Sequence, residues 1–274
     1  MSSILTNNSA MVALQTLKSV NSNLAKTQDM ISTGKEVSGA KDNAAIFAIS
    51  KVMESDVSGF KAVSDSLALG ESTVAVALAG AEQITNLLNE MKKTVVAATG
   101  ENMDHAKLTA DVTEMTAQIT SIIGASQFNG SNLLNTAGGD IDVLSSIDRA
   151  ADGSVATAAI TVESVDFEAD LDLSDIDVSD AAAATTSIAL LEAHIQTAVD
   201  GAAALGASAK RIEGQGEFVG KVMDAMKSGI GALVDADMEE TSARLQALQV
   251  QQQLATQSLS IANQAPQAIL SLFR

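Results

Sequence analysis

The chain has 274 residues and a formal net charge of −18, with no cysteine, tryptophan or tyrosine and a single proline. This acidity argues against nucleic acid and anionic membrane surfaces as partners, because both repel a strongly negative protein. No disulfide framework is possible, and aromatic residues make up only 2% of the chain. Such a composition is ordinary for long helices and unusual for an enzyme.

The first predicted helix begins in a stretch without charge. Residues 1–17 carry no charged side chain, and Lys18 is the first charged residue. Asn21 and Gln28 are neutral polar members of an apolar face at heptad spacing. The apolar members of that face are Ala10, Leu14, Leu17, Leu24 and Ile31. The sequence therefore predicts a helix suited to dry, uncharged surroundings, which ends near Gly34.

A much longer second helix is predicted to start near Asp42 or Asn43. One register of three- and four-residue spacings then runs from Ile46 to Ala98, broken only at Asp56 and Gly70. Persistence over many heptads indicates a coiled-coil-like helix. A third helix is predicted over residues 104–123, on the same kind of spacing.

The only strand-like region follows the third helix. Apolar residues recur within residues 141–147 and 160–167, on either side of an Asp152-Gly153 turn. Two such stretches around a turn signal predict a small β-hairpin near residues 140–168. Residues 170–180 are predicted to be an acidic loop or edge.

Ser179 or Asp180 is predicted to cap a long fourth helix. Its register carries no charge from Ile188 to Leu233 and then fails at Asp237 and Glu240. No heptad frame spans the twelve residues from Leu233 to Leu245, where a new apolar stripe begins.

The last helix has no charged side chain from Leu245 to Phe273, yet it contains eight glutamines. Glutamine is costly in hydrocarbon, and a free surface helix normally carries Lys and Glu. The sequence therefore predicts burial among other protein helices. Its first stripe is Leu245, Leu248, Ala255, Leu259 and Ala262, and a second stripe beside it is Val250, Leu254 and Ile261.

The register also breaks between Ile31 and Ile46. This break and the one between Leu233 and Leu245 lie at matching distances from the two chain ends. We interpret them as one domain boundary crossed twice. Residues 1–41 and 237–274 are predicted to form the two halves of one inner helical unit, and residues 42–236 an outer layer with the hairpin. The predicted fold class is mainly α, a long coiled-coil-like helical bundle with a small β-hairpin and paired N- and C-terminal helices.

Groups that could carry chemistry are sparse. His105 and His194 are isolated on helices, without the clustered ligands that a metal site requires. The acidic loop lacks the central glycine and closing glutamate of a calcium loop; its carboxylates are Asp170, Asp172, Asp175 and Asp177. Three glycines imitate a phosphate-binding spacing but lie within a helical register; they are Gly214, Gly216 and Gly220. We therefore expect no enzyme activity, no cofactor and no metal.

Several segments of the chain resemble bacterial flagellins. Residues 37–45 are similar to the flagellin junction after the first helix, and residues 128–134 to its turn before the hairpin. Residues 234–240, the glutamine-rich helix and residues 262–274 resemble the flagellin C-terminus. The resemblance implies a subunit of the flagellar filament, whose terminal helices pair as the inner tube and whose middle helices form the surrounding layer.

The resemblance also implies partners and a location. The subunit is expected to form a helical homo-oligomer and to meet the flagellar export apparatus, a flagellin export chaperone, the filament cap and hook-junction proteins. No nucleic acid or membrane partner is expected. The first residues have neither the basic start nor the continuous apolar core of a secretory signal, and no later run is apolar enough to span a bilayer. The expected location is the extracellular flagellum, reached without a cleaved signal peptide.

The terminal helices are predicted to carry polymerisation, since two uncharged helices bury too little surface to fold alone. The residues expected to make these contacts are Leu5, Leu14, Leu17, Leu24, Ile31, Leu245, Leu248, Leu254, Leu259, Ile261, Ile269, Leu270 and Leu272. Two alternatives remain open at this point. One is a flagellin-like protein of the hook–filament junction. The other is a secreted helical adhesin that binds through the hairpin and the acidic loop.

Overall fold

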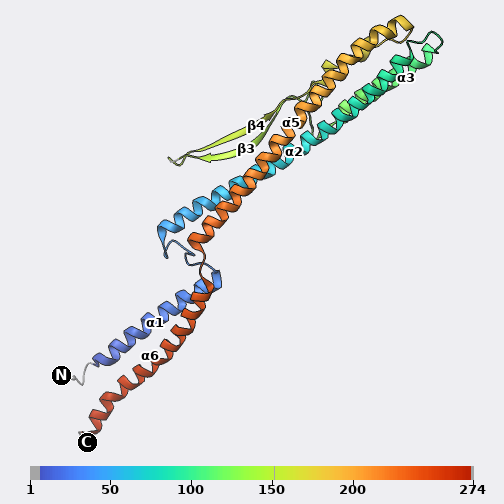
Figure 1. The fold of residues 1–274 in the computed structure, drawn as a ribbon. Coiled ribbons are helices and arrows are strands. Elements are labelled where there is room, and N and C mark those ends of the chain that lie inside the picture. The colour runs from blue at the N-terminus through green and yellow to red at the C-terminus, as the bar shows by residue number, and fades with distance from the viewer. Residues whose placement is uncertain (1–6, 151, 273–274) are drawn as a thin grey trace. The chain divides into compact units, whose positions relative to one another are not determined.

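A computed structural model describes residues 7–150 and 152–272, with side chains described as far as residue 264 (Figure 1). The chain divides into two compact units. Unit 1 comprises Met1–Ser55 and Ala225–Arg274, and unit 2 comprises Asp56–Asp224. Both ends of the chain therefore belong to the same unit.

Helices dominate the fold, as the sequence predicts. In chain order the elements are α1 (Asn8–Thr33), α2 (Ala44–Ala97), α3 (His105–Ala125), β1 (Gln127–Phe128), β2 (Ser131–Asn132), β3 (Ile141–Arg149), β4 (Val155–Val162), α4 (Phe167–Asp170), the 3-10 helix η1 (Leu173–Asp175), α5 (Ala181–Val234) and α6 (Met238–Leu272). The strands form two antiparallel pairs, β1–β2 and β3–β4. The mainly helical fold class with a small β-hairpin is confirmed.

Local capping chemistry sets several helix ends. The side chain of Asn43 accepts hydrogen bonds from the N–H groups of Ala45 and Ile46 at the start of α2. Asp180 likewise accepts from the second and third residues of α5. These acceptors satisfy N–H groups that have no partner within the helix, which is why both positions were predictable. Gly34 ends α1 in the left-handed conformation, with φ of 68°.

The core of unit 2 follows the heptad stripes of α2 and α5. On α5 a buried residue recurs every seventh position, at Ala184, Leu191, Ala198, Leu205, Ile212 and Val219. Every apolar member of the predicted register in and just after α2 is buried from residue 60 onward: Phe60, Val63, Leu67, Val74, Ala77, Ala81, Ile84, Leu88, Met91, Val95 and Ala98. Long helices in this unit therefore pack through coiled-coil-like seams.

The composition of α2 corrects one expectation about membranes. This helix contains an 18-residue window with a mean hydropathy of 1.2, enough by length and composition to cross a bilayer. The expectation that no run is so apolar is therefore wrong. Alanine and valine on both the packed and the open faces raise the mean, and one third of the window is buried inside the protein. Core helices of helical bundles pass the same test.

The β3–β4 hairpin is anchored to the helices of unit 2. Val143 lies against Gly70 of α2, where an added Cβ would come within 2.5 Å of its side chain. The register shifts between Leu144 and Ser146. Ser66 of α2 accepts from the Leu144 N–H, and Gln215 of α5 donates to the Ser145 carbonyl. Backbone groups at this bulge thus find partners on both long helices.

An ion pair joins the C-terminal end of β3 to α2. The Arg149 guanidinium donates to both carboxylate oxygens of Asp56 on α2, with Nε 3.0 Å from Oδ1 and 3.2 Å from Oδ2. Asp56, which interrupts the apolar register of α2, therefore binds Arg149 at the end of this strand. A fork-shaped guanidinium on a carboxylate fixes orientation as well as distance.

The second arm of the hairpin differs from the prediction. It spans Val155–Val162 and not residues 160–167. Phe167 instead begins α4 and is fully buried against Gly201 of α5. Periodicity alone did not separate these segments, because both carry apolar residues. The predicted turn is present, with Gly153 at φ of 86° and Asp152 accepting from the Ser154 N–H.

The acidic loop alternates exposed carboxylates with buried apolar anchors. Its buried residues are Leu171, Leu173, Ile176 and Val178. Asp172 accepts from the hydroxyl and the N–H of Ser174, which lowers the pKa of its carboxyl. Asp177 accepts from the N–H of Ser179, and its pKa is lowered for the same reason. These carboxylates thus stabilise tight turns.

We predict that Gly70→Ala loosens the hairpin, because the new methyl group occupies the space of Val143. Overpacking of this kind costs about 1–3 kcal/mol. Amide exchange of β3 and β4 should accelerate, and the urea midpoint should fall. Gly214→Ala is the control, since nothing lies within 4 Å of its added Cβ. That substitution should stabilise α5 by up to about 1 kcal/mol. Equal effects of both changes would contradict the proposed packing.

Acid should release the turn at Asp172. The pKa of the Asp172 carboxyl in the folded chain lies below its usual value of 3.8. The contribution of this carboxylate to stability is therefore complete above pH 3.8 and is lost as the pH falls through the lower, folded pKa. The Ser174 amide resonance should therefore shift in an NMR titration at pH below 3.8. Asp172→Asn keeps an acceptor oxygen but cannot titrate there, so its Ser174 amide should show no such step.

Candidate functional site

The terminal helices α1 and α6 form an antiparallel pair within unit 1 (Figure 1). The Asn7 amide donates to the Ala262 carbonyl at 2.7 Å, and the Gln252 amide donates to Asn21 Oδ1 at 2.8 Å. Cα atoms of the two helices come within 8 Å of each other along the pair. Neutral amides therefore join the helices at positions where many helix pairs use ions.

A third connection closes the pair where α1 ends and α6 begins. Lys35 and Asp235 form an antiparallel bridge. Val234 accepts from the Glu36 N–H at 2.7 Å, and Gly34 accepts from the Ala236 N–H at 3.0 Å. The two register breaks of the sequence thus meet in space, because the connecting segments exchange backbone hydrogen bonds there.

The seam of the pair follows a heptad on each helix. The heptad positions of α1 that are buried or half-buried are Ala10, Ala13, Leu17, Val20, Leu24, Thr27 and Ile31. Those of α6 are Thr241, Leu245, Leu248, Gln252, Ala255, Leu259 and Ala262. No member of either set is charged. Small residues at several of these positions permit the close approach of the two helices.

The expected contact residues divide into two groups. Leu17, Leu24, Ile31, Leu245, Leu248 and Leu259 all lie in the seam, where they hold the pair together. Leu14, Leu254 and Ile261 are exposed by 45%, 59% and 63%. The first stripe expected on α6 is therefore the packed one, and its second stripe faces outward.

Leu14 corrects the face expected for α1. Steps of three or four residues lead from Ala10 to Leu17 through either Ala13 or Leu14. Ala13 lies in the seam, because it is seven residues from Val20 and so has the same heptad position. Leu14 consequently lies beside the seam.

Four expected contact residues lie wholly or partly outside the described part of the chain. Leu5 lies outside the described residues. Ile269, Leu270 and Leu272 belong to α6, but their side chains also lie outside the described part. Their proposed role stays a prediction.

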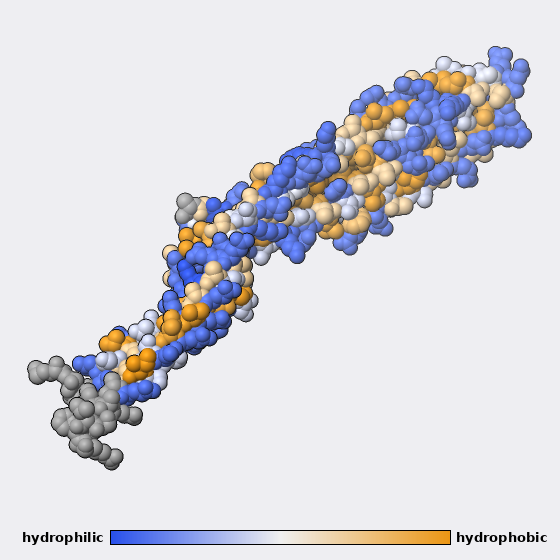
Figure 2. Space-filling view, turned by 60° about the horizontal axis from the view of Figure 1, so that its bottom comes forward, coloured by the Kyte–Doolittle hydropathy of each residue, from blue (hydrophilic) through white to orange (hydrophobic). Residues whose placement is uncertain are grey.

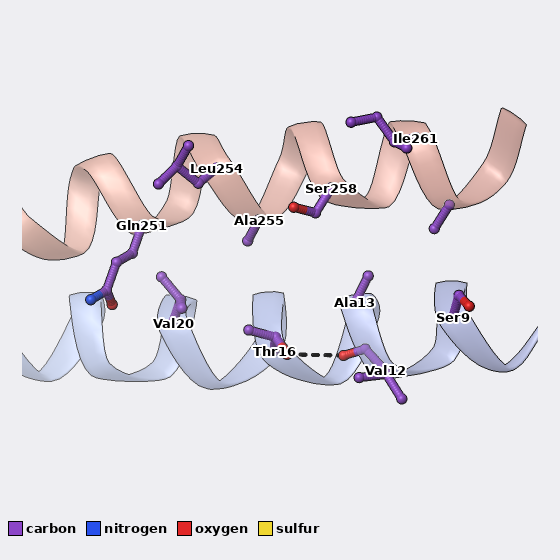
Figure 3. Close-up of a pocket in the computed structure, with 11 residues that line it drawn as sticks. Ser9, Val12, Ala13, Thr16, Val20, Gln251, Leu254, Ala255, Ser258 and Ile261 are labelled. Carbon is purple, nitrogen blue, oxygen red and sulfur yellow. Dashed lines mark hydrogen bonds between the residues drawn. The ribbon is translucent and has the colours of Figure 1, made fainter. Parts of the chain in front are cut away.

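An open groove of about 710 Å³ runs between α1 and α6 (Figure 3). It is lined by Ser9, Val12, Ala13, Thr16, Val20, Gln251, Leu254, Ala255, Ser258, Ile261 and Ala262. None of these side chains is charged. Val12 and Ile261 are each 63% exposed. Figure 2 shows this part of unit 1 with hydrophobic surface open to solvent.

Apolar burial in unit 1 is sparse. Among its described residues, the buried apolar side chains are Val20, Val37, Val234, Leu248 and Ala255. Unit 2 by contrast buries most of the core of the chain, including Ile84, Leu88 and Met91 with no exposed surface. Unit 1 thus combines a thin seam with large apolar side chains left in solvent, an arrangement suited to protein contacts.

The remaining candidate groups do not form a chemical site. In the part of the chain that the structure describes, no group of three His, Cys, Asp or Glu is placed to hold a metal ion. His105 Nδ1 lies 3.0 Å from the Val178 carbonyl, which accepts its hydrogen bond and ties the acidic loop to α3. Gly214, Gly216 and Gly220 lie within α5 and not at the strand-to-helix turn of a phosphate site.

Comparison with known proteins identifies the family. The bacterial flagellin N-terminal helical region matches residues 4–138, and the bacterial flagellin C-terminal helical region matches residues 188–273. A flagellin of Brucella melitensis biotype 1 is 41% identical, covering 100% of both chains. Flagellin FljM of Caulobacter vibrioides is 39% identical, covering 100% of this chain and 99% of that protein.

A crystal structure of Bacillus cereus flagellin is also similar, with 23% identity and a TM-score of 0.48 over 55% of this chain and 86% of that one. The sequence matches alone carry the assignment, since they span nearly all of the chain at substantial identity. The chain therefore belongs to the bacterial flagellin family, whose members are structural proteins and not enzymes.

Proposed function

We propose that the α1–α6 pair is the surface through which copies of this chain polymerise. As a flagellin, the chain is a structural subunit that self-assembles into the extracellular filament of the bacterial flagellum, which drives swimming. The groove with its exposed apolar side chains is the observation that carries this proposal.

Few apolar side chains of unit 1 are buried, so the seam alone offsets little of the entropy lost on ordering two helices. Val12, Leu254 and Ile261 remain in water in a single subunit. Neighbouring copies would cover these side chains and supply the missing contacts. A head-to-tail contact that does not close then extends into a helical filament.

The uncharged chain ends support the layer assignment proposed for the chain. Residues 1–41 and 237–274 would form the inner layer, where uncharged ends pack against each other. Residues 42–236, with the hairpin, would form the surrounding layer. Charged side chains are absent from residues 1–17 and 245–273, so copies can meet there without burying ions.

Further partners follow from the family and remain proposals. The subunit would leave the cell through the flagellar export apparatus without a cleaved signal peptide, escorted by a flagellin export chaperone. It would then meet hook-junction proteins and the filament cap. A role at the hook–filament junction or as a secreted adhesin is less well supported, because the matching proteins are named flagellins.

Removing either terminal helix should abolish polymerisation. Deletion of residues 1–31 or of residues 245–274 leaves unit 2 with its own buried core, so a soluble helical monomer is expected. Electron microscopy and sedimentation would detect filaments. Filaments formed by either truncated chain would refute the proposed role of the pair.

Point substitutions separate polymerisation from folding. Leu254→Ser and Ile261→Ser together remove side chains that are already exposed, so monomer helicity should change little while filaments fail to form. Leu248→Ser is the matched comparison, because its side chain is buried in the seam. That change should cost about 2–5 kcal/mol and lower the helix signal of the monomer as well. Normal filament yield from the first variant would count against the groove.

A further inference from the structure

Met11 is the most exposed methionine among the described residues of the chain. Its side chain is 63% exposed, compared with 44% for Met103 and 43% for Met238. The other described methionines are buried or half-buried: Met30, Met53, Met91, Met115, Met223 and Met226. Oxidation of a thioether requires access of the oxidant to the sulfur. Met11 is therefore the described methionine that an oxidant in solution reaches most readily.

Met11 lies on the face of α1 that points away from α6. With about 3.6 residues per helical turn, it is roughly opposite the seam positions Ala13 and Val20. Leu14, three residues further along, shares this outer face and is 45% exposed. Both side chains belong to the charge-free residues 1–17. The outer face of α1 thus presents an uncharged apolar ridge, the Met11–Leu14 ridge, in addition to the groove between α1 and α6.

An open-ended filament requires two different contact surfaces on each copy, because a head-to-tail contact joins one patch to a different patch of the next molecule. The groove supplies one such surface, since it is concave and uncharged and includes small residues such as Ser9 and Ala255. The convex Met11–Leu14 ridge matches the groove in apolar character and in lack of charge. A second copy of this chain is therefore the partner that the ridge fits.

We infer that Met11 is an oxidation site in the contact between copies, where its sulfoxide blocks polymerisation. This inference rests on the proposed function. Hydrogen peroxide transfers one oxygen atom to the Met11 sulfur: the O–O bond breaks and an S–O bond forms. The sulfur is oxidised by two electrons, and the peroxide is reduced to water. Water solvates the polar sulfoxide of a free copy, whereas a contact between copies buries it without a partner.

The test treats the monomeric full chain with hydrogen peroxide, removes the peroxide and measures the critical concentration for polymerisation. Peptide mass spectrometry reports the sulfoxide content of Met11. The critical concentration should rise at least about tenfold, as expected for burial of one unpaired polar group. When filaments are treated instead, Met11 should react several-fold more slowly than in the monomer, because neighbouring copies cover it. Equal reaction rates in monomer and filament would overturn the inference and leave the groove contact intact.

Three variants locate the effect. Met11→Leu keeps the apolar shape and removes the sulfur, so its critical concentration should stay within about twofold of the parent value and should not respond to peroxide. Met103→Leu is the matched control: it removes an exposed thioether from unit 2 and should leave the chain as sensitive to peroxide as the parent. Met11→Gln places a polar group at this position without an oxidant and should raise the critical concentration about tenfold. Monomer helicity should not change in the Met11 variants, since Met, Leu and Gln have similar helix propensities.

Persistent inhibition of Met11→Leu by peroxide would assign the effect to another methionine and overturn the inference. Polymerisation of Met11→Gln at the parent's critical concentration would overturn it as well. Failure of the untreated parent chain to polymerise would instead contradict the proposed function.

Discussion

The antiparallel contact between α1 and α6 is the interaction on which this subunit depends, because it joins the two chain ends into one unit. Its seam is built from leucine, isoleucine, alanine, valine, threonine and glutamine, with no charged residue among its described members. Such a seam is weakly apolar and closely spaced, and amide pairs such as Gln252 with Asn21 help to fix its register. A contact of this kind orders the helices while leaving apolar side chains on their outer faces for other molecules.

Unit 2 is stabilised mainly by a buried core. Its long helices bury continuous heptad stripes, and the hairpin and the acidic loop are fixed to them by side-chain acceptors and donors. Glycine at position 70 lets a strand approach the helix backbone, and Asp56 receives Arg149 from the same strand. This unit therefore has a core of its own, whereas unit 1 has mainly a seam.

The two units differ in net charge and in exposed apolar surface, and both properties affect assembly. A self-assembling subunit must expose apolar surface for its neighbours and must also avoid sticking nonspecifically as a monomer. In this chain the apolar surface lies on a neutral pair, and the strong negative charge lies on the other unit. Net charge far from zero favours solubility of the free subunit. Charge and contact surface are thus assigned to separate parts of one molecule.

The sequence alone determined much of the local structure. Side-chain acceptors at Asn43 and Asp180 mark helix starts, and the Asp152-Gly153 turn marks the hairpin. Helical periodicity predicted the long elements, and the absence of charge in the end segments pointed to pairing between them. These features are local, since each depends on residues within a few positions of one another.

Only the tertiary structure decided which faces are covered. A helix with apolar residues on two stripes is a helix either way, and its partner selects the stripe that is buried. On α1 the seam takes Ala13 and leaves Leu14 exposed, while on α6 it takes Leu248 and leaves Leu254 exposed. The same holds for Phe167, which leaves the hairpin because a close approach to Gly201 buries its ring. Periodicity is a property of one segment, whereas burial depends on what another segment brings to it.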